Sequence, residues 1–219
     1  MRRQLRHIVL LSCCAVVLSV AGFGCEVASP PTAPVSTTSA LWNEAKGRPQ
    51  LLSGELFSGD GDAESVARAF LQSRSEEFQL TGEGFSLELT TTRTGLAGEY
   101  LRFGQWQVVN GERLPVFGGE VIVLVTDFGA KRVVRALNLE HFESAKTVKH
   151  EGDLGMNGAV ERALVLVNAA SSELDAEPTA TRGVYVNEAG VARVAWKVGL
   201  LLESASPPHD WSVFVDAAN

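Results

Sequence analysis

Cysteine is scarce in this chain, which has three cysteines in 219 residues. Two of them, Cys13 and Cys14, lie in an N-terminal apolar stretch that we expect to be removed by processing. The processed chain then keeps Cys25 at most, and a single cysteine excludes an internal disulfide. A lone cysteine near a new N-terminus is best explained as a lipid acceptor, and a free surface thiol is the alternative.

Basic residues are also in short supply, with 19 Lys and Arg against 26 Asp and Glu. Three arginines stand within the first six residues, so removal of residues 1–24 shifts the formal net charge from −7 to about −10. This balance argues against nucleic acid as a partner and against a basic membrane-binding surface. Contact with a membrane is then expected only through a lipid anchor.

The sequence lacks a hydrophobic run long enough to cross a bilayer. Residues 8–20 are apolar apart from serines and cysteines and follow three arginines. They fall short of the ~20 residues of a transmembrane helix, which favours an export signal. The Ser-Val-Ala of residues 19–21 fits ordinary signal cleavage, whereas the Gly-Phe-Gly-Cys of residues 22–25 resembles an imperfect lipobox. The Ser/Thr/Pro/Ala-rich residues 27–40 read as a tether and favour lipidation of Cys25.

Complete catalytic and metal-binding motifs are missing as well. His150-Glu151 opens like the zinc motif H-E-x-x-H, but Leu154 stands where the second histidine is required. Asp60, Asp62 and Glu64 imitate the start of a calcium loop that lacks its glycine and its last glutamate. A solvated linker and a helix N-cap at Asp62 explain these residues better.

The remaining polar motifs give no chemistry either. The Asp-Phe-Gly of residues 127–129 spells a kinase motif without the other kinase elements, and predicts a turn. The four histidines, His7, His141, His150 and His209, are scattered along the sequence. We therefore expect a chain that is not an enzyme, with no catalytic residue, no metal ligand and no cofactor.

What is present is a hydrophobic pattern that changes period twice. Apolar residues at 63, 66, 67, 70 and 71 predict one helix face, and residues 85–89 alternate as a half-buried strand does. Strands are then expected over residues 100–109, 114–125 and 133–139. A second helical stripe begins near Asn157, and strands follow over 184–186, 191–202 and 211–216.

The stretch from Tyr100 to Val125 carries the sharpest signal, because it predicts a β-hairpin closed by Asn110-Gly111. The adjacent Gly118 and Gly119 predict a bulge or a close backbone approach within the return strand. We expect Phe117 and Val121 to pack into the core of the first unit.

This hairpin resembles the propeptide (FTP) domain of fungalysin- and thermolysin-type zinc metalloproteases. The residues that carry the resemblance are Gln105, Asn110, Gly111, Pro115, Val116, Phe117, Gly118, Gly119 and Glu120. The second half of the chain, with tryptophan strands at 194–198 and 211–217, is similar to the PepSY domain that follows in such propeptides. The resemblance covers residues 57–219, and its second half is the looser match.

The resemblance implies an α+β fold of two helix-plus-antiparallel-sheet units in a cystatin-like arrangement. The expected organisation is a signal peptide at 1–24, a flexible tether at 25–56, an FTP-like domain at 57–145 and a PepSY-like domain at 146–219. It also implies a propeptide function, as inhibitor and folding assistant of a metalloprotease catalytic domain. Trp196, Trp211 and Asp216 are the residues expected to face that partner.

Two alternatives stay open at this point. The chain is either the N-terminal part of a longer protease precursor or a free-standing protein that acts in trans. The alternative function is that of a non-catalytic envelope lipoprotein that uses the same folds to bind other proteins. Either way, we expect an exported protein, held in a bacterial cell envelope or released outside the cell.

Lipidation of Cys25 is directly testable. We expect mass spectrometry of the mature N-terminus to find lipid on Cys25, and Cys25→Ser to release the protein from the membrane fraction. An unmodified N-terminus at Gly22 or Cys25 would instead mean soluble secretion.

Overall fold

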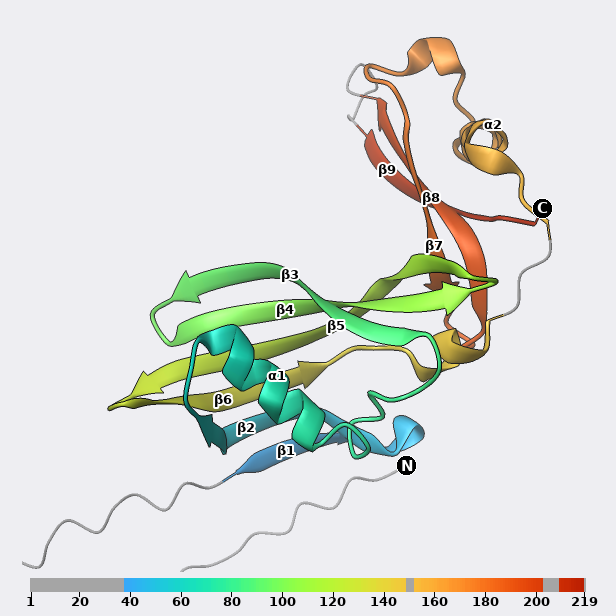
Figure 1. Cartoon of the computed structure of the whole chain (residues 1–219). Helices are drawn as coiled ribbons and strands as arrows, with labels where there is room; N and C mark the ends of the chain where they lie inside the picture. Colours follow the sequence, from blue (N-terminus) through green and yellow to red (C-terminus); the bar gives the residue numbers. More distant parts are fainter. Residues whose placement is uncertain (1–37, 149–151, 203–208, 219) are drawn as a thin grey trace, which may run out of the picture. The chain divides into compact units, whose positions relative to one another are not determined.

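Extended backbone dominates the described part of the chain, residues 38–148, 152–202 and 209–218 of a computed structural model (Figure 1). These residues belong to one compact unit, Ser36–Asn219. The strands are β1 (Ser39–Asn43), β2 (Arg48–Gly59), β3 (Phe85–Gly95), β4 (Gly98–Val109), β5 (Glu112–Phe128), β6 (Lys131–Leu139), β7 (Thr179–Val186), β8 (Ala192–Leu202) and β9 (His209–Asp216). The helices are α1 (Ala63–Ser73) and α2 (Gly155–Val167), with 3-10 turns η1 (Glu44–Lys46), η2 (Glu143–Thr147) and η3 (Ser171–Glu173).

The expected fold of two separate helix-plus-sheet units is wrong. All nine strands form a single mixed sheet in the order β1-β2-β6-β5-β7-β8-β9, with β4 on β5 and β3 on β4. Strands hold 54% of the described residues and helices only 20%, so the fold is mostly β rather than two balanced α+β units. The physical reason is the length of β5, which pairs with strands from both halves of the chain and thereby joins them.

The sheet also begins earlier than the sequence indicated. β1 and most of β2 lie within residues 25–56, which were expected to be a flexible tether. β2 pairs with β6, and its Leu52 is buried in the main core. The apolar alternation of β2 is weak and interrupted, so its place in the sheet depends on the partner strand and not on a local signal.

Helix α1 lies across one face of the sheet, over β2, β6, β5 and β4 (Figure 1). Its side chains Val66, Ala67 and Phe70 are buried in the main core, as the helical spacing predicted. The N-cap at Asp62 is confirmed, because its carboxylate accepts a hydrogen bond from the Ser65 amide at 2.7 Å. This hydrogen bond is the main cause of the lowered pKa of Asp62.

In the second half of the chain, α2 covers β8 and β9, the strands at the end of the sheet path away from β1. Ala159 and Ala163 of α2 pack on Val198, Leu200 and Val215 of β8 and β9. The expected helix near Asn157 and the hairpin of β7 and β8 are both confirmed. Within the described residues, no helix is long and apolar enough to span a membrane.

The predicted hairpin between β4 and β5 is confirmed in detail. Asn110 and Gly111 both have positive φ, 51° and 82°, as a tight two-residue turn requires. Further along, four residues of β5, numbers 116–119, lie opposite the single residue Gln105 of β4. The glycine pair therefore marks a bulge, with Gly118 at φ +74°.

Gly119 is needed because Gln105 occupies the space above it. A Cβ on Gly119 would lie 2.7 Å from Gln105 Oε1. Gln105 is 1% exposed and bonds both backbone groups of Phe142: its Nε2 donates to the carbonyl at 2.8 Å, and its Oε1 accepts from the amide at 2.8 Å. This pairing, the Gln105 clamp, fixes the chain where it leaves β6.

The expected position of Phe117 is wrong, although that of Val121 is confirmed. Val121 is fully buried in the main core. Phe117 is only half-buried, and its ring packs on Phe214 of β9 with centroids 5.4 Å apart. The bulge turns β5 between these two residues, so the simple alternation from Val121 back to Phe117 is broken.

The Gln105 clamp can be tested against a matched residue. Gln105→Ala leaves two backbone groups of Phe142 without partners, and we expect it to lower the free energy of unfolding by about 3 kcal/mol. Gln107→Ala is the control, since Gln107 is equally buried on the same strand but bonds mainly one carbonyl, that of Glu83. Urea unfolding should show the smaller loss for Gln107→Ala, about 1 kcal/mol. Equal losses would contradict the role given to the clamp.

Candidate functional site

A buried pair of polar side chains, Arg48 and His141, lies at one end of the first half of the sheet. Arg48 opens β2, and His141 follows the end of β6. The antiparallel register of these strands, with Leu51 opposite Asn138, carries the two residues to the same level although they are 93 positions apart. Arg48 is 1% exposed and His141 is fully buried.

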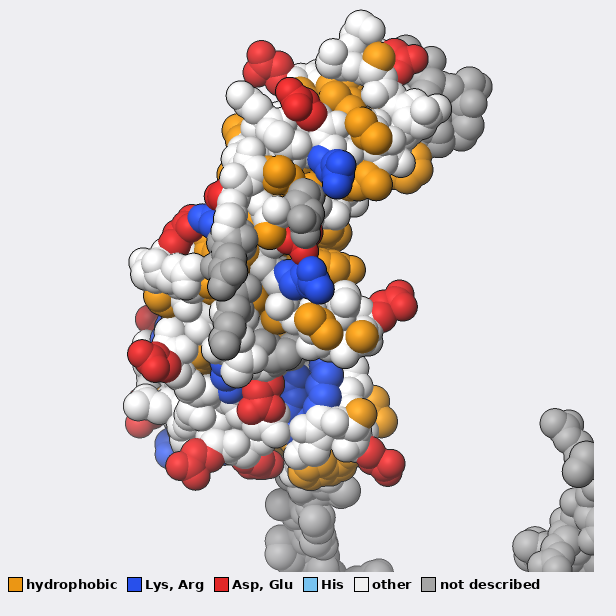
Figure 2. Space-filling model, turned by 90° about the vertical axis from the view of Figure 1, so that its right-hand side faces the viewer, with side chains coloured by type: hydrophobic (Ala, Val, Ile, Leu, Met, Phe, Trp, Pro, Cys, Tyr) orange, Lys and Arg blue, Asp and Glu red, His pale blue; other side chains and the backbone are white. Residues whose placement is uncertain are grey.

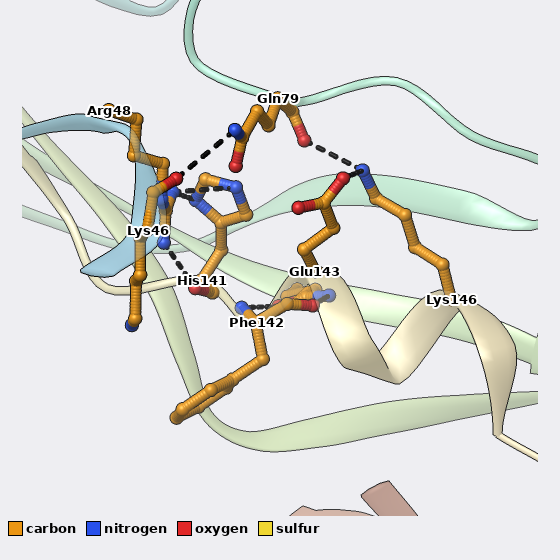
Figure 3. A network of polar contacts seen from close by, with 8 residues as sticks. Lys46, Arg48, Gln79, His141, Phe142, Glu143 and Lys146 are labelled. Carbon is orange, nitrogen blue, oxygen red and sulfur yellow. Dashed lines mark hydrogen bonds and ion pairs between the residues drawn. The ribbon is translucent and has the colours of Figure 1, made fainter. Parts of the chain in front are cut away.

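The Arg48 side chain contacts both the ring and the backbone carbonyl of His141 (Figure 3). Arg48 Nη1 lies 2.7 Å from His141 Nε2 and also contacts Nδ1, and Arg48 Nη2 donates to the His141 carbonyl at 2.6 Å. A guanidinium group only donates hydrogen bonds, so the histidine ring must supply an acceptor nitrogen and is neutral.

Three further segments lie beside this pair and are tied to one another (Figure 3). Gln79, after α1, donates from Nε2 to the Lys46 carbonyl of η1 at 3.2 Å. Lys146 of η2 donates to the Gln79 carbonyl at 2.8 Å. The Lys46 and Phe142 side chains extend away from the pair in the same direction (Figure 3), with Lys46 Nζ 5.3 Å from the Phe142 ring centroid. The site thus combines η1, β2, the segment after α1, and η2.

The electrostatics of the site follow from burial and from neighbouring cations. Burial, assisted by the charges of Arg48 and Lys146, lowers the pKa of His141 to about 3. Burial also lowers the pKa of Lys46, and Arg48 lowers it further. The pKa values of Arg48 and Lys146 are lowered by burial too, against an opposing effect of the Glu143 carboxylate.

This arrangement is suited to binding rather than to proton transfer. A general base needs an acceptor that can reach the substrate, and the ring of His141 is engaged by Arg48 and fully buried. The cationic groups instead create a positive local field that favours an anion.

A cavity of about 550 Å³ adjoins the pair. It is lined on one side by Lys46, Arg48 and Phe142, and on the other by Tyr185 and the turn between β7 and β8. Figure 2 shows the side of the molecule on which η1 and η2 lie, with Lys and Arg side chains grouped beside acidic and hydrophobic ones. A site of this size is in the range of small-ligand pockets.

The residues of the hairpin motif come together elsewhere, at the joint between the two halves of the sheet. Val116 makes the parallel pairing with Val184 of β7, and a Cβ on Gly183 would lie 2.6 Å from the Pro115 carbonyl oxygen. Glu120 pairs with Arg102 across β4 and β5 at 2.5 Å. The motif therefore has a structural role.

The residues expected to face a partner do not form one surface. Trp196 is half-buried, on the face of the sheet that carries α2, and donates from Nε1 to Asp153 at 3.0 Å. Trp211 is 41% exposed on that same face, opposite Leu200. Asp216 points to the other face and pairs with Arg193 at 2.8 Å. Cys25, His150 and Glu151 lie outside the described residues.

Sequence reasoning missed Arg48 and His141, and the aromatic residues Tyr185 and Phe214. Nothing local marks the first pair, because its members come from strands far apart in sequence. A signal did exist for Phe214, since strict alternation along β9 places Ser212, Phe214 and Asp216 on the face opposite α2.

Neither metal ligands nor relatives identify the site. Among the described residues, no group of three or more His, Cys, Asp or Glu side chains could hold a metal ion. No protein-family model matches the chain, and no curated protein matches it.

The neutral state of His141 predicts a pH dependence. The unfolded chain takes up a proton at this histidine near pH 6.5, whereas the folded chain does so only near pH 3. The unfolded state therefore gains the proton first, and stability is lost as the pH falls between these values. We expect a loss of about 2 kcal/mol between about pH 7 and pH 5, measured by urea unfolding.

Two variants separate His141 from the other groups that titrate. His141→Asn should remove most of this loss, and His209→Asn should retain it. NMR of the wild-type ring gives an independent readout, because the His141 signals should remain those of a neutral ring at pH 5. Titration of that ring near pH 6 would contradict the assignment.

Proposed function

We propose that the chain is a non-enzymatic binding module whose partner is the catalytic domain of a thermolysin- or fungalysin-like metalloprotease. It acts on that domain as an inhibitor and folding assistant, either within a longer precursor or in trans. The proposal rests on the resemblance of the β4–β5 hairpin to protease propeptides, together with one structural observation, a partly exposed aromatic surface beside the last strand.

That surface, the aromatic patch, consists of Phe117, Tyr185 and Phe214. Tyr185 and Phe214 stack with ring centroids 4.6 Å apart, and Phe117 adds a third ring at 5.4 Å from Phe214. Phe214 is 37% exposed. The residues that pack under α2 and η2, including Val184 and Val198, lie on the opposite face of these strands.

The neighbours of the aromatic patch suit an interface between proteins. Lys197 lies opposite Phe214, and Arg193 lies opposite Tyr185. Exposed aromatic side chains with cationic neighbours are enriched where proteins bind one another, and a few such anchors supply most of the affinity. β9 is also the last strand of the sheet path, so its outer edge adjoins the patch.

The function is tested with a purified thermolysin-like zinc protease. The mature chain should slow cleavage of a peptide substrate or assist refolding of the denatured protease at micromolar concentrations. Phe214→Ala should weaken this effect by about tenfold, because it removes a central anchor. Phe128→Ala is the control, since Phe128 is 63% exposed at the far end of β5, next to the turn into β6.

Two results would count against the proposal. Equal effects of Phe214→Ala and Phe128→Ala would show that the aromatic patch is not the contact. Absence of both inhibition and refolding assistance would favour the alternative, an envelope lipoprotein that binds other proteins.

A further inference from the structure

The positive charge of Arg48 is not balanced by its contacts, and its cavity shares Tyr185 with the aromatic patch. Its guanidinium is buried, and its hydrogen-bond partners are the neutral ring and the carbonyl of His141. Among the described residues, no carboxylate lies within ion-pair distance of Arg48. A buried cation without a close counter-ion is costly, so its retention calls for an explanation beyond folding.

The acidic groups near the site lie outside the pair. Glu143 is 61% exposed and lies 4.0 Å from Lys146. Glu140 is exposed and raises the pKa of Lys46, but this effect is smaller than the lowering by burial and by Arg48. Glu188 is exposed on the turn at the other wall of the cavity. These carboxylates are solvated, whereas Arg48 is buried, so the buried part of the cavity lining is cationic and its exposed part carries charges of both signs.

The cavity wall offers apolar surface beside this cationic end. Phe142, Tyr185 and Val186 line it, together with Asn187, Glu188 and Gly190 of the turn between β7 and β8. Phe142 is held in place by the Gln105 clamp, so this wall is fixed by the fold before any ligand arrives. A preformed wall lowers the entropic cost of binding.

We propose that this cavity binds a peptide carboxylate that has an apolar side chain next to it. Lys46 receives the carboxylate, and the charge of the buried Arg48 adds to the attraction. Phe142 and Tyr185 contact the apolar neighbour. The carboxylate is either the side chain of an acidic residue or the free C-terminus of a peptide, because both present the same two oxygens to the cations. The inference goes beyond the proposed function, since it holds whichever protein supplies the peptide.

Three small probes test the chemistry on the purified mature chain. N-acetyl-phenylalanine carries a terminal carboxylate, and N-acetyl-Phe-Glu-amide carries a side-chain carboxylate. N-acetyl-phenylalanine amide is the neutral control. Backbone NMR signals should shift at Lys46, Phe142 and residues 185–190 with a carboxylate probe, and not with the neutral control. The stronger of the two carboxylate probes identifies the source of the carboxylate.

Substitutions show whether the shifts arise from the named cations. Lys46→Gln should weaken binding of the carboxylate probe by about tenfold, which corresponds to one charge-assisted hydrogen bond. Lys46 is exposed, so this variant is expected to fold. Lys131→Gln, at the exposed start of β6, is the matched control and should bind as the wild type does.

The proposal is overturned by any of three results. These are equal binding of the neutral probe, shifts confined to other parts of the chain, and an equal effect of Lys46→Gln and Lys131→Gln. None of these measurements involves a protease, so their failure is distinguishable from failure of the proposed function.

Discussion

The structure depends on the bulge at Gly118 and Gly119, where β5 changes neighbours. Beyond the bulge, β5 pairs with β6, and before it β5 meets β7 at Val116. The Gln105 side chain fills the space that Gly119 leaves, and bonds the backbone of Phe142. One local irregularity therefore joins the two halves of the sheet and also fixes the segment that carries His141.

The fixed segment also determines the state of the buried pair Arg48 and His141. With Phe142 fixed, His141 lies beside Arg48 and is neutral, because the pair is buried and a guanidinium cannot accept a hydrogen bond. A buried pair of this kind adds little net stability compared with an apolar pair of the same size. Its cationic end, facing a cavity with aromatic walls, is the feature that gives this part of the fold a capacity for binding.

The hairpin motif and the two proposed binding surfaces are largely distinct parts of the molecule. Most motif residues have a structural role at the joint, where the carbonyl of Pro115 lies close to Gly183. Phe117 is the exception, since it serves both the joint and the aromatic patch. A motif of this kind is a signature of the fold, whereas the choice of partner depends on the surface side chains around it.

The sequence by itself determined the local structure: the α1 stripe with its Asp62 cap, the Asn110-Gly111 turn, and the glycine bulge. Each depends on residues within a few positions of one another, so periodicity and turn chemistry are sufficient to predict it. Only the tertiary structure decided that β1 and β2 join the sheet, that one sheet replaces two, and that Arg48 meets His141. Those outcomes depend on pairing between strands far apart in sequence, which leaves no local pattern because the partner strand supplies the hydrogen bonds and the burial.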